Sequence, residues 1–96
     1  MQEKIQNIIF HSLKNLADEL ENDNLKNSNL ETKIYGIDGN LDSLALVSLV
    51  SDLEEALNEE FQKEIILANE RTMSGRNSPF KDVKTLASYI EDLLRG

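Results

Sequence analysis

Three segments of the chain repeat their apolar residues every three or four positions, and this spacing limits the possible folds most strongly. It is the spacing of an amphipathic helix. The segments are residues 2–21, 44–61 and 83 to the C-terminus, and no segment alternates with the period of two that marks a half-buried strand. The pattern therefore predicts an all-α fold. The apolar residues that carry it are Ile5, Ile8, Ile9, Leu13, Leu16 and Leu20, then Leu46, Leu49, Val50, Leu53 and Leu57, and finally Val83, Leu86, Ala87, Ile90, Leu93 and Leu94.

Two connecting regions complete this picture. The run at 21–29 is rich in Asn and Asp, which end helices by bonding their own backbone, and a long loop follows to about residue 41. In residues 62–80, the apolar side chains predict a buried turn or short helix, and the Ser-, Gly- and Pro-containing run after them predicts a loop. The expected fold is a small bundle of three long helices plus one short helix, with a long first loop. The loop residues expected across the core are Leu25, Leu30, Ile34, Tyr35 and Ile37, and those expected in the buried turn are Ile65, Ile66, Leu67, Ala68 and Met73.

Asp42 and Ser43 stand directly before the second periodic segment, and Asp82 stands before the third. Asp and Ser are preferred at helix N-termini, so both positions predict a helix start. Leu44 and Val47 interrupt the second pattern, because they project on its polar side within a turn of Ser43. We expect both to be exposed.

Charge is concentrated in the middle of the chain. The 96 residues carry 18 acidic and 10 basic side chains, and seven of the acids but no base lie within residues 34–62. An acidic protein repels phosphate backbones, so nucleic acid is not an expected partner. The acidic stretch is either a solvated helix face or a surface that steers a basic partner.

Several classes of site are excluded by composition. The chain has no cysteine, so it forms no disulfide and has no thiolate ligand or thiol nucleophile of its own. Its longest apolar runs are four residues, far short of the ~20 that a membrane helix needs. Its first residues lack the features of a signal peptide, so the expected location is cytoplasmic.

Metal and hydrolytic chemistry also lack support. His11 is the single histidine and has no companion at metal-ligand spacing. Residues 38–42 imitate the opening of a calcium-binding loop, but Ser43 stands where that pattern needs Gly and Leu49 where it needs Glu. Ser43 also lacks the glycines of a nucleophile elbow. We therefore do not expect Ser43 to act as a hydrolytic nucleophile.

Ser43 is better suited to accept a modification. A phosphate on a serine at a helix N-terminus lies against unpaired backbone N–H groups and the positive end of the helix dipole. The alternative is that Asp42 and Ser43 are only helix caps.

The sequence around Ser43 reads Leu41-Asp42-Ser43-Leu44, and Leu53-Glu54-Glu55 begins ten residues after the serine. In these stretches the chain resembles the acyl carrier protein family, which includes peptidyl and aminoacyl carriers. The resemblance covers about residues 2–94. It also rests on Val47, Leu49 and Val50, and on Asp82-Val83 and the run from Leu86 to Ile90.

The resemblance implies a single acyl carrier domain over residues 1–96, folded as a four-helix carrier. Ser43 would be esterified by 4'-phosphopantetheine, which a magnesium-dependent phosphopantetheinyl transferase donates from coenzyme A. The protein would itself not be an enzyme. It would carry acyl or aminoacyl groups as thioesters on that arm, in fatty-acid-type or specialised biosynthesis.

The same resemblance implies roles for individual residues. Asp42 and Leu44 would serve recognition by the transferase, whereas Val47, Glu54 and Glu55 would contact partner enzymes. The residues that would line a space for the acyl chain are Leu49, Val50 and Leu53.

The implied partners are the transferase, an acyl- or aminoacyl-loading ligase, and downstream acyl-transfer enzymes with basic docking surfaces. The carrier itself would be a monomer. Ala45 and Ser48 stand where fatty-acid carriers usually have acidic residues. In this the chain looks like stand-alone carriers of specialised pathways, which a dedicated ligase loads.

A second hypothesis belongs to another functional class. The chain would be a small acidic helical interaction module without a prosthetic group. Leu44, Val47 and the acidic face would bind a partner helix, and Ser43 would only cap its own helix.

Overall fold

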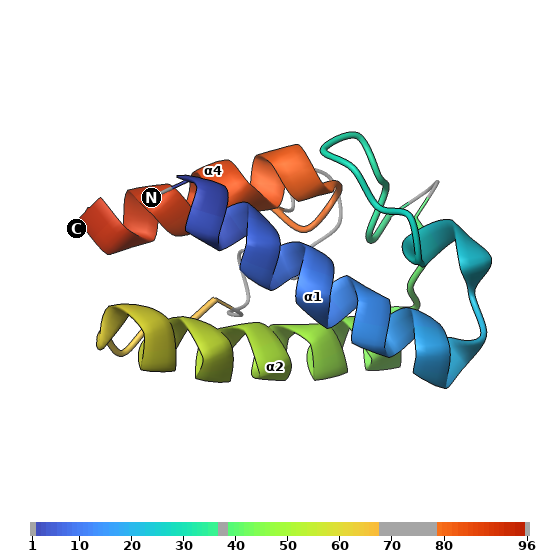
Figure 1. The fold of residues 1–96 in the computed structure, drawn as a ribbon, viewed down its shortest axis with the longest axis horizontal. Helices are drawn as coiled ribbons and strands as arrows, with labels where there is room; N and C mark the ends of the chain where they lie inside the picture. Colours follow the sequence, from blue (N-terminus) through green and yellow to red (C-terminus); the bar gives the residue numbers. More distant parts are fainter. Residues whose placement is uncertain (1, 37–38, 68–78, 96) are drawn as a thin grey trace.

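The computed structural model describes residues 2–36, 39–67 and 79–95, and the regular secondary structure within these ranges is helical. The α-helices are α1 (Gln2–Leu20), α2 (Ser43–Phe61) and α4 (Val83–Arg95), with a short 3₁₀ turn, η1, at Asp23–Leu25. No strand forms within the described ranges, which confirms the predicted helical class. Figure 1 shows α1 passing between α2 and α4, and both helices pack against it.

The core is built from the apolar faces that the periodicity predicted. Ile5, Ile9 and Leu13 of α1 are fully buried, and they face apolar side chains of α2 and α4. Burying such a side chain contributes about 1.5–3 kcal/mol. The other α-helical residues of the core are Leu16, Ala17, Ala45, Leu46, Leu49, Val50, Leu53, Leu57, Val83, Leu86, Ala87, Ile90 and Leu94.

Helix ends follow the local chemistry of the chain. After α1, Glu21 takes a left-handed conformation with φ of 55°, and the Asn22 N–H bonds the Ala17 carbonyl at 3.0 Å. This 6→1 bond is that of a Schellman motif, which stops the helix. After α2, Gln62 is also left-handed, with φ of 52°. The chain then turns back along α2.

The predicted short helix is not found in the described part of the chain. Residues 62–67 are not helical, and residues 68–78, including Ala68 and Met73, lie outside the described ranges. Ile65 and Leu67 are buried as expected, but Ile66 between them is 67% exposed. The expectation that all three residues are buried was therefore wrong for Ile66. The segment is not helical, and adjacent side chains of a non-helical backbone can point to opposite sides.

The long first loop is fixed to the segment before α4. The Ile34 N–H bonds the Lys81 carbonyl at 2.9 Å and the Tyr35 N–H bonds the Phe80 carbonyl at 3.1 Å. In the reverse direction, the Val83 N–H bonds the Thr32 carbonyl at 3.2 Å. Leu25 and Ile34 are fully buried, as the sequence predicted, whereas Leu30 is exposed and Ile37 lies outside the described ranges.

Within the described ranges, no helix combines the length and apolar character that a membrane span requires.

Candidate functional site at the N-terminus of α2

Asp42 determines where α2 begins. Its backbone is extended and its carboxylate accepts the Ala45 N–H at 2.8 Å, while its carbonyl accepts the Leu46 N–H at 2.9 Å. These are the two bonds of an N-cap residue. Ser43 therefore is the first residue of α2 and not its cap. The N–H groups of the first turn that Asp42 does not bond have no partner within the helix.

Ser43 is exposed, and its hydroxyl points to one neighbouring side chain in the described structure. The Ser43 Oγ and the Tyr35 hydroxyl oxygen lie 3.4 Å apart, and either atom could donate. This distance is longer than the 2.7–2.8 Å typical of O–H···O bonds. The serine hydroxyl is therefore held only weakly and remains accessible from solvent.

The first loop positions Tyr35 at this serine. Gly36 has φ of 115°, a backbone conformation that favours glycine. A Cβ at Gly39 would lie 2.5 Å from the Tyr35 Cα, so the backbones of the two residues are in direct contact. Beyond this turn, the Leu41 N–H bonds the Ile34 carbonyl at 2.9 Å. The loop returns the chain to Asp42 with Tyr35 beside Ser43.

Leu44 and Val47 are exposed, as their positions in the periodic pattern predicted. Leu44 is 82% exposed and Val47 is 56% exposed. Both belong to the first two turns of α2, close to Ser43. They form an apolar surface beside an accessible hydroxyl. We call Leu44 and Val47 the apolar pair.

Leu49, Val50 and Leu53 lie on the opposite side of α2 and are buried in the core. Their burial agrees with their place in the helical pattern. Their side chains belong to the interior that α1, α2 and α4 share.

Glu54 and Glu55 differ in their surroundings. The Glu54 carboxylate accepts the Leu67 N–H at 2.8 Å and is half-buried, whereas Glu55 is exposed. One turn further along α2, the Asn58 side-chain oxygen accepts the Ile65 N–H at 2.9 Å. Glu54 and Asn58 thus hold residues 62–67 against α2.

An open groove of about 240 Å³ lies between α1 and α2. The groove is acidic, because the carboxylates of Asp52, Glu55 and Glu59 line it. His11 of α1 also lines the groove. In the parts of the chain that the structure describes, no three His, Cys, Asp or Glu side chains gather closely enough to hold a metal ion. Asp38, from the calcium-loop comparison, lies outside those parts. The remaining residues that line the groove are Ser12, Asn15 and Ala56.

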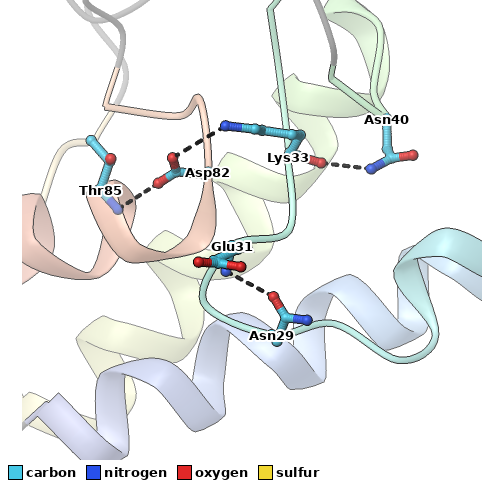
Figure 2. Close-up of polar contacts among 6 residues, drawn as sticks. All are labelled: Asn29, Glu31, Lys33, Asn40, Asp82 and Thr85. Carbon is cyan, nitrogen blue, oxygen red and sulfur yellow. Dashed lines mark hydrogen bonds and ion pairs between the residues drawn. The ribbon is translucent and has the colours of Figure 1, made fainter.

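Asp82 caps α4 and links it to the first loop, as Figure 2 shows. Its carboxylate accepts the Thr85 N–H at 2.8 Å and lies 3.9 Å from the Lys33 ammonium. Partial burial alone would raise the pKa of Asp82, but the hydrogen bonds from Thr85 and the charges of Lys33 and Lys81 outweigh it. The net result is a pKa below the ordinary value for Asp. The loop that carries Tyr35 is therefore held by a charged group.

In the same view, the Asn29 side-chain oxygen accepts the Glu31 N–H at 2.8 Å, and the Asn40 side chain donates to the Lys33 carbonyl at 2.7 Å (Figure 2). The first bond holds the loop just before Lys33, and the second holds Lys33 to residue 40.

Comparisons with known proteins returned no match to a protein-family model, a curated protein or a solved structure.

The sequence predicted Tyr35 only as a residue lying across the core, and its position beside Ser43 was not predicted. The glycines at 36 and 39 were predicted as turn residues, and the Gly39 N–H does bond the Gly36 carbonyl at 3.1 Å. That signal was available, but a spacing of eight residues through a loop does not by itself place two hydroxyls together.

Proposed function

We propose that the chain is an acyl or aminoacyl carrier and that 4'-phosphopantetheine is attached to Ser43. The observation that carries this proposal is the exposed Ser43 hydroxyl at the first residue of α2, next to the exposed apolar pair. A serine at this position is accessible to a modifying enzyme. Its phosphoester would lie at the positive end of the α2 dipole, near N–H groups that lack helical partners.

The residues of this site fit the attached group. Ser43 Oγ is accessible, and with the residues that the structure describes it makes no short hydrogen bond that the new ester would have to break. Asp42 uses its carboxylate to cap α2, so the helix start is fixed before and after modification.

In the transfer, Ser43 Oγ forms a bond to phosphorus and its proton passes to a base of the transferase. An anhydride bond of coenzyme A breaks, and adenosine 3',5'-bisphosphate leaves.

When attached, the arm supplies a terminal thiol that holds an acyl or aminoacyl group as a thioester. The chain has no cysteine, so it has no thiol of its own that would compete for the cargo. We assign to Leu49, Val50 and Leu53 the lining of the interior that an acyl chain would enter. They are apolar and buried on the core side of α2.

Partner recognition is assigned to the exposed side of α2. The apolar pair offers contact area, and exposed Glu55 offers a negative charge to basic partner enzymes. The expected partners are the transferase, a loading ligase and acyl-transfer enzymes. Glu54 has a structural role because its carboxylate holds Leu67. The carrier is proposed to work as a cytoplasmic monomer.

The test is the intact mass of the full chain after incubation with coenzyme A, magnesium and a broad-specificity phosphopantetheinyl transferase. We expect the mass of one phosphopantetheine to be added to the wild type and to Ser48→Ala, and none to Ser43→Ala. Ser48 is a matched control, because it is another exposed serine of α2. The absence of any added mass, with the transferase active on a known carrier, would contradict the proposal.

The exposure of the apolar pair also favours the second hypothesis, an interaction module without a prosthetic group. The two hypotheses differ in the effect of substitutions on partner binding. In the interaction module, Val47→Glu would abolish binding of a partner helix and Ser43→Ala would leave it unchanged. In the carrier, Ser43→Ala abolishes loading completely.

A further inference from the structure

Tyr35 is the side chain that the described structure brings within hydrogen-bonding range of Ser43 Oγ. We propose that in the modified protein the Tyr35 hydroxyl donates a hydrogen bond to a phosphate oxygen of the Ser43 phosphoester and so fixes the root of the attached arm. This inference rests on the proposed function, because it concerns the group attached to Ser43. It makes Tyr35 a positioning residue.

The distance between the two hydroxyls fits this role. At 3.4 Å, the contact between Tyr35 and Ser43 is too long to be a strong bond in the unmodified protein. A phosphoester places anionic oxygens beyond the serine oxygen, where a nearby hydroxyl can donate to them. Hydrogen bonds to an ionised acceptor are shorter and about twice as strong as those between neutral groups. Modification therefore replaces a weak contact by a strong one.

The charge of the surrounding chain supports the same conclusion. Residues 34–62 contain no Lys or Arg, so this stretch brings no cationic side chain to the phosphate. The donors that remain there are neutral. In the described structure, those nearest to Ser43 include the first N–H groups of α2 and the Tyr35 hydroxyl, which both donates and accepts.

The loop holds Tyr35 firmly enough for this purpose. Its N–H bonds the Phe80 carbonyl at 3.1 Å, its backbone contacts Gly39, and its half-buried ring packs against the core. The hydroxyl is at the exposed end of a side chain whose backbone and ring are both fixed. A donor held in this way loses little conformational freedom when it binds the phosphate.

The test is a thermodynamic cycle on the full chain, because a merely structural role for Tyr35 affects the unmodified and modified forms equally. Unfolding is measured by denaturant for both forms of the wild type and of Tyr35→Phe, which keeps the ring and removes the hydroxyl. Loading is expected to lower the equilibrium constant for unfolding by about two- to tenfold more in the wild type than in Tyr35→Phe. Tyr89→Phe is the matched control, since it removes the chain's other tyrosine hydroxyl, on α4.

Phosphorus NMR of the modified proteins provides a second measurement. The phosphodiester signal is expected to shift in Tyr35→Phe and to stay at its wild-type position in Tyr89→Phe. In the modified wild type, the Tyr35 hydroxyl proton is expected to correlate with phosphorus, and this observation needs no variant.

The outcomes separate the two proposals. The role of Tyr35 is refuted, and the carrier function stands, if the wild type is loaded but two results agree. Loading then stabilises the wild type and Tyr35→Phe equally, and the phosphorus signal of Tyr35→Phe stays at its wild-type position. If the wild type accepts no phosphopantetheine from an active transferase, both proposals are refuted.

Discussion

The Glu54 carboxylate accepts a hydrogen bond from the Leu67 backbone N–H at 2.8 Å, and this bond ties residues 62–67 to α2. Glu54 is thereby separated in role from its neighbour Glu55, which is exposed on the same helix. Two adjacent acids of the same type serve different purposes, because α2 turns one toward residues 62–67 and the other toward solvent.

Replacing Glu54 should destabilise the fold, whereas replacing Glu55 should not. Glu54→Ala leaves the Leu67 N–H without its charged acceptor, at an expected cost of about 1–3 kcal/mol in the free energy of unfolding. Glu55→Ala should change it by less than about 0.5 kcal/mol, as exposed substitutions usually do. Urea unfolding of the two variants measures both values. Equal losses would show that the Glu54 bond has no stabilising effect.

Asp42 and Ser43 should also differ, although they are adjacent. Asp42→Ala removes the side chain that caps α2 and should cost about 0.5–2 kcal/mol in unfolding free energy. Ser43→Ala removes no capping bond and should stay within about 0.5 kcal/mol of the wild type. Thermal and urea unfolding measure the effects. A large loss for Ser43→Ala would mean that the serine, and not Asp42, caps the helix.

Stability should fall in acid partly through Asp82. The pKa of Asp82 in the folded protein lies below its ordinary value of 3.8, so its charged form favours folding. This contribution is present above the unfolded pKa and is lost as the pH falls through the lower folded pKa. Between pH 6 and pH 3, the wild type should therefore lose more unfolding free energy than Asp82→Asn, which keeps a capping oxygen but does not ionise. Parallel losses in urea titrations at the two pH values would contradict this.

Gln62→Gly should stabilise the protein. Gln62 adopts φ of 52° after α2, and a left-handed conformation costs a residue other than glycine roughly 1–2 kcal/mol. Glycine loses more backbone entropy on folding, and this cost is subtracted from the relieved strain. The free energy of unfolding is therefore expected to rise by about 0.5–1 kcal/mol. Gln6→Gly, within α1, is the control and should destabilise by about 0.5–1 kcal/mol. A lower denaturation midpoint for Gln62→Gly would refute the prediction.

Local patterns were sufficient to predict α1, α2 and α4 and their first residues, but the short helix expected within residues 62–80 is not found in the described part of the chain. The spacing of Ile5, Ile9 and Leu13 predicted the buried face of α1, and Asp42 and Asp82 marked the starts of α2 and α4. These features depend on residues within a few positions of one another, where the helical period and capping preferences apply. The exposure of Leu44 and Val47 followed from the same geometry.

Contacts between distant residues could not be predicted in this way. The Glu54 bond to Leu67 joins residues thirteen positions apart, and the Tyr35 bond to Phe80 joins the first loop to the start of α4. Nothing in the local pattern specifies which N–H meets which acceptor across such distances. The bond to Phe80 holds Tyr35, the residue beside Ser43, so the candidate site was predicted only in part.

The bonds from the first loop to residues 80–83 also determine when the surroundings of Ser43 are complete during synthesis. The ribosome releases residues 34–43 well before Phe80 and Lys81, whose carbonyls accept the N–H groups of Tyr35 and Ile34. A nascent chain that has not yet exposed these residues has Ser43 but not the fixed Tyr35 beside it. The finished surroundings of Ser43 therefore form only after residues 80–83 have left the ribosome.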